Sequence, residues 1–335
     1  MNNKHTREDL IRKILGKDIL IEDICRIKRH SPIHYTLPGK ADVLRVKYNK
    51  PNQKKEDVIV KILSQKLSSK NLPNKDTPFQ VKHIATGTVN SENISYEVLD
   101  FIPGRAFSKT LKEVHLSGEL SNNVVKQTLK ISDYLADIYN QSSKSDKVVY
   151  VRETCNFITY TKKQINFLRS HESYNKYNKS VKIIDNSLDK LLKDSINREK
   201  VCLVHNDFHP NNIIFNGSDL HTIDKIGRLY GDQLVDISAV TLFYIWNELR
   251  SDIESRPFLK LHNLFMDNYV NKTKNNMFGS LPIFYGSKSV MLIYNSELMK
   301  LNTQLNKPLL NIVCKSINED ISIYDSTINL INNKV

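Results

Sequence analysis

The sequence has few cysteines and no long apolar run, and these two absences exclude several classes of protein. Only four of its 335 residues are cysteines, and they lie far apart, without a Cys-x-x-Cys pair or a Cys/His cluster. Such usage argues against a zinc site or a disulfide framework and fits a reduced, cytoplasmic setting. The longest apolar run, residues 240–246, is too short to cross a membrane, and the first ten residues lack the apolar core of a signal peptide. We therefore expect a cytoplasmic protein without a membrane span.

The rest of the composition is that of a folded and basic chain. Hydrophobic residues make up 40% of the sequence, which suffices for a full core in one bilobal unit or in two domains. The formal net charge of +13 fits nucleic acid, a membrane surface or an anionic ligand as a partner. No stretch interleaves basic and aromatic residues as nucleic-acid sites do. We interpret the charge as a solvated surface, part of which could face the phosphates of a ligand.

One segment, residues 201–240, carries polar residues with a spacing typical of a catalytic site. An apolar run ends in His205-Asn206-Asp207, and Asn212 follows five residues after the aspartate. Asn216-Gly217 predicts a tight turn between two short strands, which would return the chain to Asp224 beside that loop. Oxygens of Asn212 and Asp224 could hold Mg²⁺, which prefers oxygen ligands and substrate phosphates, and Asp207 would meet a substrate hydroxyl. This arrangement indicates a phosphoryl-transfer site.

The same segment resembles the catalytic segment of the aminoglycoside phosphotransferase and choline kinase family. The pattern of that family is H-G-D-x-x-x-x-N, then an I-D pair, then G-D-x-x-x-D-[LI]-[AS]. The matching residues are His205-Asn206-Asp207 with Asn212, Ile223-Asp224, and GDQLVDIS at 231–238. Four pieces in order over about forty residues favour this interpretation over a polar hairpin with chance carboxylates. The resemblance implies an α+β, bilobal, protein-kinase-like fold with a small antiparallel β-rich N-lobe and a larger, mainly helical C-lobe.

The resemblance also assigns roles to individual residues of the segment. Asp207 would orient the acceptor hydroxyl and take its proton, while Asn212 and Asp224 would ligate Mg²⁺ between the phosphates. Asp236 would tie down the backbone of the catalytic loop, and His205 would pack behind that loop. For His209, in the same loop, the sequence gives no role, and we expect it to be exposed to solvent.

The nucleotide would bind to the first third of the chain. Lys61 lies in a β-branched run at 57–63, where an ammonium group needs a partner or a ligand. By resemblance Lys61 contacts the α- and β-phosphates of ATP or GTP; the alternative is a lysine at the wet edge of a strand. Kinase-like lobes pair this lysine with a glutamate on the next helix, here a short candidate at 64–69. From Ile62 to Ser91 the only acid is Asp76. We therefore expect Lys61 to pair with Asp76 or with a distant carboxylate, or to have no carboxylate partner.

Further strands and the boundary between the lobes follow from the same pattern. Two strands are expected between Ile33 and Tyr48, joined by a turn at 38–40 that would cover the phosphates. Strands at 81–89 and 94–100 lead into YEVLDFIPG, which resembles the hinge of the family. In that hinge, at 98–104, backbone groups of Asp100 and Ile102 would hold the adenine. We place the N-lobe at 1–103 and the C-lobe at 104–335.

Most of the C-lobe is expected to be helical. The segment 171–179 is polar and predicts an exposed loop, and the acids near the C-terminus are interpreted as solvated. Apolar residues recur at helical spacing over residues 121–140, 153–170 and 180–196, and again from 258 to 330; in the N-lobe the same spacing is found at 6–15.

The predicted function is phosphotransfer from ATP or GTP to a hydroxyl of a small molecule, as in aminoglycoside phosphotransferases. A choline/ethanolamine-type kinase is the alternative, because Asn206 gives the HND motif of those enzymes. Against it, Ile226 stands where they carry a second acid after Asp224. A second alternative is a nucleotide-binding pseudokinase or regulator, suggested by the missing helix glutamate and by Lys225 beside Asp224. An aromatic cage for a quaternary ammonium near Trp246 is conceivable, but a core helix fits that segment better.

Overall fold

The structure, a computed structural model, divides into two compact units. One comprises Met1–Gly104 with a short stretch that begins at His221, and the other comprises the remaining residues. The residues that the structure describes are 4–27, 41–51, 55–63, 82–89, 91, 94–142, 147–195, 201–223, 229–275, 278–298 and 304–332.

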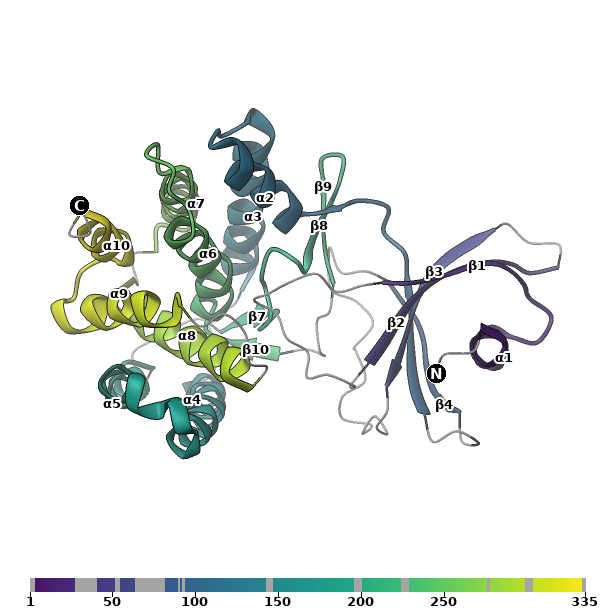
Figure 1. The fold of residues 1–335 in the computed structure, drawn as a ribbon, viewed down its shortest axis with the longest axis horizontal. Coiled ribbons are helices and arrows are strands. Elements are labelled where there is room, and N and C mark those ends of the chain that lie inside the picture. Colours follow the sequence, from purple (N-terminus) through teal and green to yellow (C-terminus); the bar gives the residue numbers. More distant parts are fainter. Residues whose placement is uncertain are drawn as a thin grey trace. The chain divides into compact units, whose positions relative to one another are not determined.

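The first unit is a helix and an antiparallel sheet (Figure 1). The strands lie in the order β1-β2-β3-β5-β4, and each is antiparallel to its neighbour. The element bounds are α1 Lys4–Leu15, β1 Leu20–Arg26, β2 Ala41–Asn49, β3 Glu56–Leu63, β4 His83–Val89 and β5 Ile94–Asp100.

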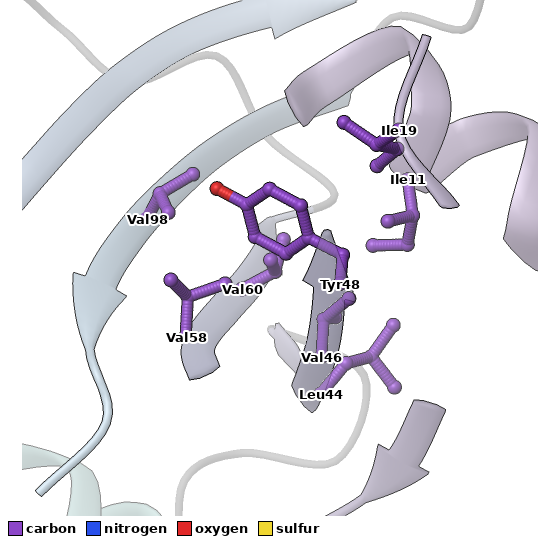
Figure 2. Packing of buried hydrophobic residues seen from close by; sticks show 8 residues of the cluster. All are labelled: Ile11, Ile19, Leu44, Val46, Tyr48, Val58, Val60 and Val98. Carbon is purple, nitrogen blue, oxygen red and sulfur yellow. The ribbon is translucent and has the colours of Figure 1, made fainter. Parts of the chain in front are cut away.

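Alternation along the strands gives this sheet one buried face. Val58 and Val60 of β3 and Val98 of β5 point to the same side, where Ile11 of α1 joins them in one apolar cluster (Figure 2). Tyr48 of β2 lies in the middle of the cluster. Burying an aliphatic side chain of this kind contributes about 1.5–3 kcal/mol. The cluster therefore fixes α1 against the sheet.

The expected elements of this unit are largely confirmed. The helix at 6–15 and the strands at 57–63, 81–89 and 94–100 are present as α1, β3, β4 and β5. Of the two strands expected between Ile33 and Tyr48, the second is β2, whereas the first lies outside the described residues. The turn at 38–40 and the short helix at 64–69 also lie outside them. The sequence pattern missed β1.

The second unit contains most of the helices, as expected. Ser121 caps α3, since its hydroxyl accepts the N–H of Val124 at 3.3 Å. The bounds are β6 Arg105–Ala106, α2 Phe107–Ser117, α3 Asn122–Gln141, α4 Lys147–Ser170, α5 Asn178–Ser195, β7 Cys202–Val204, β8 Ile213–Asn216, β9 Asp219–Thr222, β10 Leu229–Gly231, α6 Leu234–Leu249, α7 Pro257–Thr273, α8 Leu281–Leu298, α9 Asn306–Glu319 and α10 Ile323–Asn332.

Two small sheets hold the segment that resembles a catalytic site. β7 pairs with β10, and β8 lies between β6 and β9. The hairpin that Asn216-Gly217 predicts is confirmed, with Gly217 at φ +59° in the turn between β8 and β9. The loop from His205 to Asn212 therefore starts at the end of one short strand and ends at the start of another.

The prediction of an exposed loop at 171–179 is wrong. A short 3-10 helix runs over Glu172–Lys176, and α5 begins at Asn178. Tyr177 between them is buried, and its hydroxyl donates to the carboxylate of Glu297 at 2.8 Å. One buried aromatic ring that finds a partner far along the chain thus orders a stretch whose composition is otherwise polar.

No helix in the described part of the chain combines the length and the hydropathy that a membrane span requires.

Candidate active site

Asp207 and Asn212 contact each other in the loop between β7 and β8. The amide nitrogen of Asn212 donates to the backbone carbonyl and to Oδ2 of Asp207, both at 3.0 Å. Asn212 is buried, whereas the side chain of Asp207 is 50% exposed. The Asp207 carboxylate is therefore held by protein at Oδ2, while half of the side chain is exposed.

His209 holds the same carboxylate oxygen, so the expectation that it faces solvent is wrong. Only 3% of His209 is exposed, and its Nε2 lies 3.4 Å from Oδ2 of Asp207. Nδ1 of His209 accepts the N–H of Asn211 at 3.2 Å. In the neutral ring the proton must then be on Nε2, where it faces Asp207.

The tight winding of the loop explains the burial of His209. Its N–H donates to the carbonyl of Asp207 at 3.0 Å, and its carbonyl accepts the N–H of Asn212 at 2.8 Å. These bonds direct the ring inward. Nothing in the residue type distinguishes such a histidine from an exposed one.

Asp236, in the first turn of α6, binds the start of the loop through both carboxylate oxygens. Oδ2 accepts the N–H of His205 at 2.7 Å, and Oδ1 accepts the N–H of Asn206 at 2.8 Å. His205 is buried, with its ring edge against Phe208 at a centroid distance of 5.8 Å. Phe208 in turn stacks on Tyr134 of α3. The loop is thus fixed at its backbone by a carboxylate and beneath its surface by aromatic packing.

Asn206 occupies the left-handed region, with φ +65°. Glycine reaches this region without strain, and asparagine reaches it more readily than most residues with a Cβ atom. This explains why an asparagine can stand where the resembling pattern has a glycine. The side chain is exposed, so its effect on stability acts through the backbone.

We expect Asn206→Gly to keep the free energy of unfolding within about 0.5 kcal/mol of wild type, since glycine favours the same conformation. Asn206→Ala should lower it by about 1 kcal/mol, because an ordinary residue with a Cβ atom is strained at positive φ. Urea unfolding of both variants measures the difference. Equal losses in the two variants would mean that the asparagine side chain, and not the backbone conformation, matters here.

Of the two residues expected to ligate Mg²⁺, only Asn212 is described; Asp224 lies outside the described residues, as do Lys225 and Ile226 beside it. Because Asn212 directs its amide nitrogen at Asp207, its amide oxygen is the atom that would meet a cation. Such an oxygen suits a hard cation. Within the described ranges no three His, Cys, Asp or Glu residues gather as a metal site.

In the first unit, Lys61 has a carboxylate partner on the neighbouring strand. Lys61 of β3 lies opposite Glu97 of β5 in register, and its Nζ is 3.9 Å from Oε2 of Glu97. The two side chains are 13% and 18% exposed. Opposite charges at facing positions of an antiparallel pair attract each other, and here they do so in a largely buried place. A carboxylate that is distant in the sequence, that of Glu97, therefore lies beside Lys61, whereas Asp76 lies outside the described residues.

The residues expected to form the hinge, 98–104, start in the last residues of β5 and continue beyond its end at Asp100. The N–H of Asp100 donates to the carbonyl of Lys82 at 3.0 Å, and the N–H of Phe101 donates to that of Asp57 at 3.2 Å. Arg45 binds the Asp57 carboxylate through two nitrogens, and its guanidinium lies 3.7 Å from the centre of the Phe101 ring. Sequence reasoning missed Arg45 and Asp57, which anchor the chain just before Ile102.

The sheet of one unit and the helices of the other, with the loop between β7 and β8, define a protein-kinase-like fold of the kind found in small-molecule kinases. This confirms the fold that the sequence predicts. No family model and no curated protein matches the sequence.

Three solved structures illustrate this likeness. The amicoumacin kinase hAmiN is 12% identical, with a TM-score of 0.56 over 96% of this chain and 97% of its own. A choline kinase from Cryptosporidium parvum is also 12% identical, with a TM-score of 0.52 over 98% of this chain and 97% of its own. A choline/ethanolamine kinase family protein from Mesorhizobium loti is 9% identical, with a TM-score of 0.54 over 98% and 99%. At these identities the likeness establishes the fold.

Proposed function

We propose that the protein is a phosphotransferase that moves the γ-phosphate of ATP or GTP to a hydroxyl of a small molecule. The observation that carries this proposal is the half-exposed Asp207 carboxylate, held at Oδ2 by Asn212 and His209. A carboxylate fixed in this way can accept the proton of a substrate hydroxyl through its other oxygen. Phosphoryl transfer requires little more from the protein than such positioning and the neutralisation of phosphate charge.

In this proposal the first unit binds the nucleotide. Lys61, with Glu97 beside it, would contact the α- and β-phosphates. The N–H of Asp100 already donates within the sheet, so the adenine would be held by its carbonyl and by the backbone of Ile102. Asn212, together with Asp224, would hold Mg²⁺, which neutralises charge on the phosphates when bound. The amicoumacin kinase structure contains AMP-PNP and Ca²⁺, which supports a nucleoside triphosphate with a divalent cation as the donor.

For the acceptor, an amino-bearing alcohol or sugar of the aminoglycoside type is the first candidate. Similar structures include the amicoumacin kinase in complex with Ami and an aminoglycoside phosphotransferase from Streptomyces rimosus in complex with ADP and streptomycin. A choline- or ethanolamine-type acceptor is the second, favoured by Asn206 and by two similar structures named for those activities.

An acceptor panel tests the proposal. Full-length protein with Mg-ATP or Mg-GTP is offered aminoglycosides, choline, ethanolamine and amino sugars, and nucleoside diphosphate release is followed together with the mass of the acceptor. We expect an acceptor-dependent gain of one phosphate and release of one diphosphate. Nucleotide binding by calorimetry without any transfer would contradict the enzyme and favour a nucleotide-binding regulator.

A further inference from the structure

A lysine is buried directly behind the catalytic loop. Lys288 is 7% exposed and lies in a stretch of α8, residues 281–290, that is buried throughout. An ammonium group in such a place is costly unless polar groups compensate it. Its Nζ donates to the backbone carbonyl of Asn206 at 2.9 Å, although the two residues are 82 positions apart in the chain.

This bond attaches the catalytic loop to a second helix, α8, in addition to α6. The N–H groups of His205 and Asn206 donate to Asp236 of α6, while the carbonyl of Asn206 accepts from α8. That carbonyl belongs to the planar peptide group that joins Asn206 to Asp207. Fixing the direction of this carbonyl therefore fixes the orientation of the peptide group to which the Asp207 residue is attached, and with it the direction of the Asp207 side chain. The left-handed conformation of Asn206 is therefore held by protein on both sides.

The charge of Lys288 also suits its surroundings. Burial lowers the pKa of its ammonium group, and the carboxylates of Asp207 and Asp236 act against this by raising it. The lysine thus lies in the field of both carboxylates, one of which, Asp236, is almost fully buried. A positive charge at this place offsets part of the cost of burying that carboxylate.

We infer that Lys288 is a positioning residue, which holds the Asn206 carbonyl and thereby aims the Asp207 carboxylate at the acceptor hydroxyl. This inference rests on the proposed function. The residue does not touch the substrate, and it acts through the loop backbone. A displacement of about 1 Å at a reacting group can cost about 10²-fold in rate, so a bond that fixes this peptide plane has a large effect.

The test compares three variants at α8. Lys288→Met has a similar length but no donor, Lys288→Arg keeps charge and donors, and Ser287→Ala removes only the buried bond between Ser287 and Thr161. We expect Lys288→Met to lower kcat about 10²-fold with both KM values within about threefold of wild type. The kcat of Lys288→Arg should be at least about tenfold higher than that of Lys288→Met, since an arginine can still donate to the carbonyl. Ser287→Ala should lower the melting temperature but keep kcat.

Two further measurements make the result unambiguous. Thermal unfolding shows whether each variant folds. If Lys288→Met does not fold, Lys288→Leu, which also lacks a donor, takes its place with the same expected results. Hydrogen exchange at the amides of His205 and Asn206 should become about tenfold faster in Lys288→Met and stay unchanged in Ser287→Ala.

The outcomes separate the two proposals. A Lys288→Met variant with wild-type kcat and wild-type exchange at both amides overturns the inference and leaves phosphotransfer standing. A wild-type protein that phosphorylates no acceptor overturns the proposed function, while the exchange of the two amides still decides whether Lys288 fixes the loop.

Discussion

Asp207→Asn should lower kcat about 10³-fold while the nucleotide KM stays within about threefold of wild type. Asn212 donates to Oδ2 of Asp207, and Nε2 of His209 lies 3.4 Å from the same oxygen, so the amide oxygen of an asparagine would take that position. Its NH₂ group would then stand at the position of Oδ1, the oxygen that we propose accepts the proton of the acceptor hydroxyl. A donor at this place cannot accept the proton of the hydroxyl. Steady-state kinetics with the best acceptor of the panel measures the change.

Asp137→Asn is the matched control, since it makes the same replacement at an exposed position of α3. It should keep kcat and KM at wild-type values. Because the asparagine in the Asp207 variant can accept the bonds that the aspartate accepts, its melting temperature should change little. An Asp207→Asn variant that is folded and fully active would exclude Asp207 as the residue that takes the proton.

Lys61→Met should lower kcat/KM for the nucleotide about 10²-fold, and Glu97→Gln should lower it about tenfold. The first change removes the charge proposed to contact the phosphates. The second leaves that charge in place but removes the carboxylate beside it, in a region where both side chains are largely buried. Initial rates at varied nucleotide and saturating acceptor give both values.

The double variant tests whether Glu97 acts through Lys61. In a Lys61→Met background, Glu97→Gln should cost less than about twofold in kcat/KM, because the group that it positions is already gone. Additive losses would show that Glu97 acts by another route. Glu113→Gln, an exposed position of α2, serves as the control for the same replacement.

The sequence predicts the features that depend on spacing within one segment. Asp207 and Asn212 lie five residues apart on one loop, and a loop of that length brings them into contact. The hairpin at Gly217 is likewise local, since it depends on the conformation of one or two residues. The strands β3 and β5 are recognisable because their apolar residues alternate around a buried face.

The partners that the sequence does not reveal lie far along the chain. Glu97 reaches Lys61 only through the register of β3 on β5, and Lys288 reaches Asn206 from a helix 82 residues away. His209 and Tyr177 look like loop residues, but tertiary contacts bury them. Pattern reasoning gives the chemistry of the loop, whereas the supporting contacts need the packing of whole elements.

The position of Glu97 has a consequence for how activity could be controlled. In protein kinases the glutamate that pairs with the nucleotide lysine stands on a helix, and moving that helix switches the enzyme on or off. Here the two charges stand on adjacent, hydrogen-bonded strands of one sheet, so no rotation of a helix can separate them. We expect a constitutively assembled pair, so the proposed enzyme would not be switched by moving a glutamate that stands on a helix.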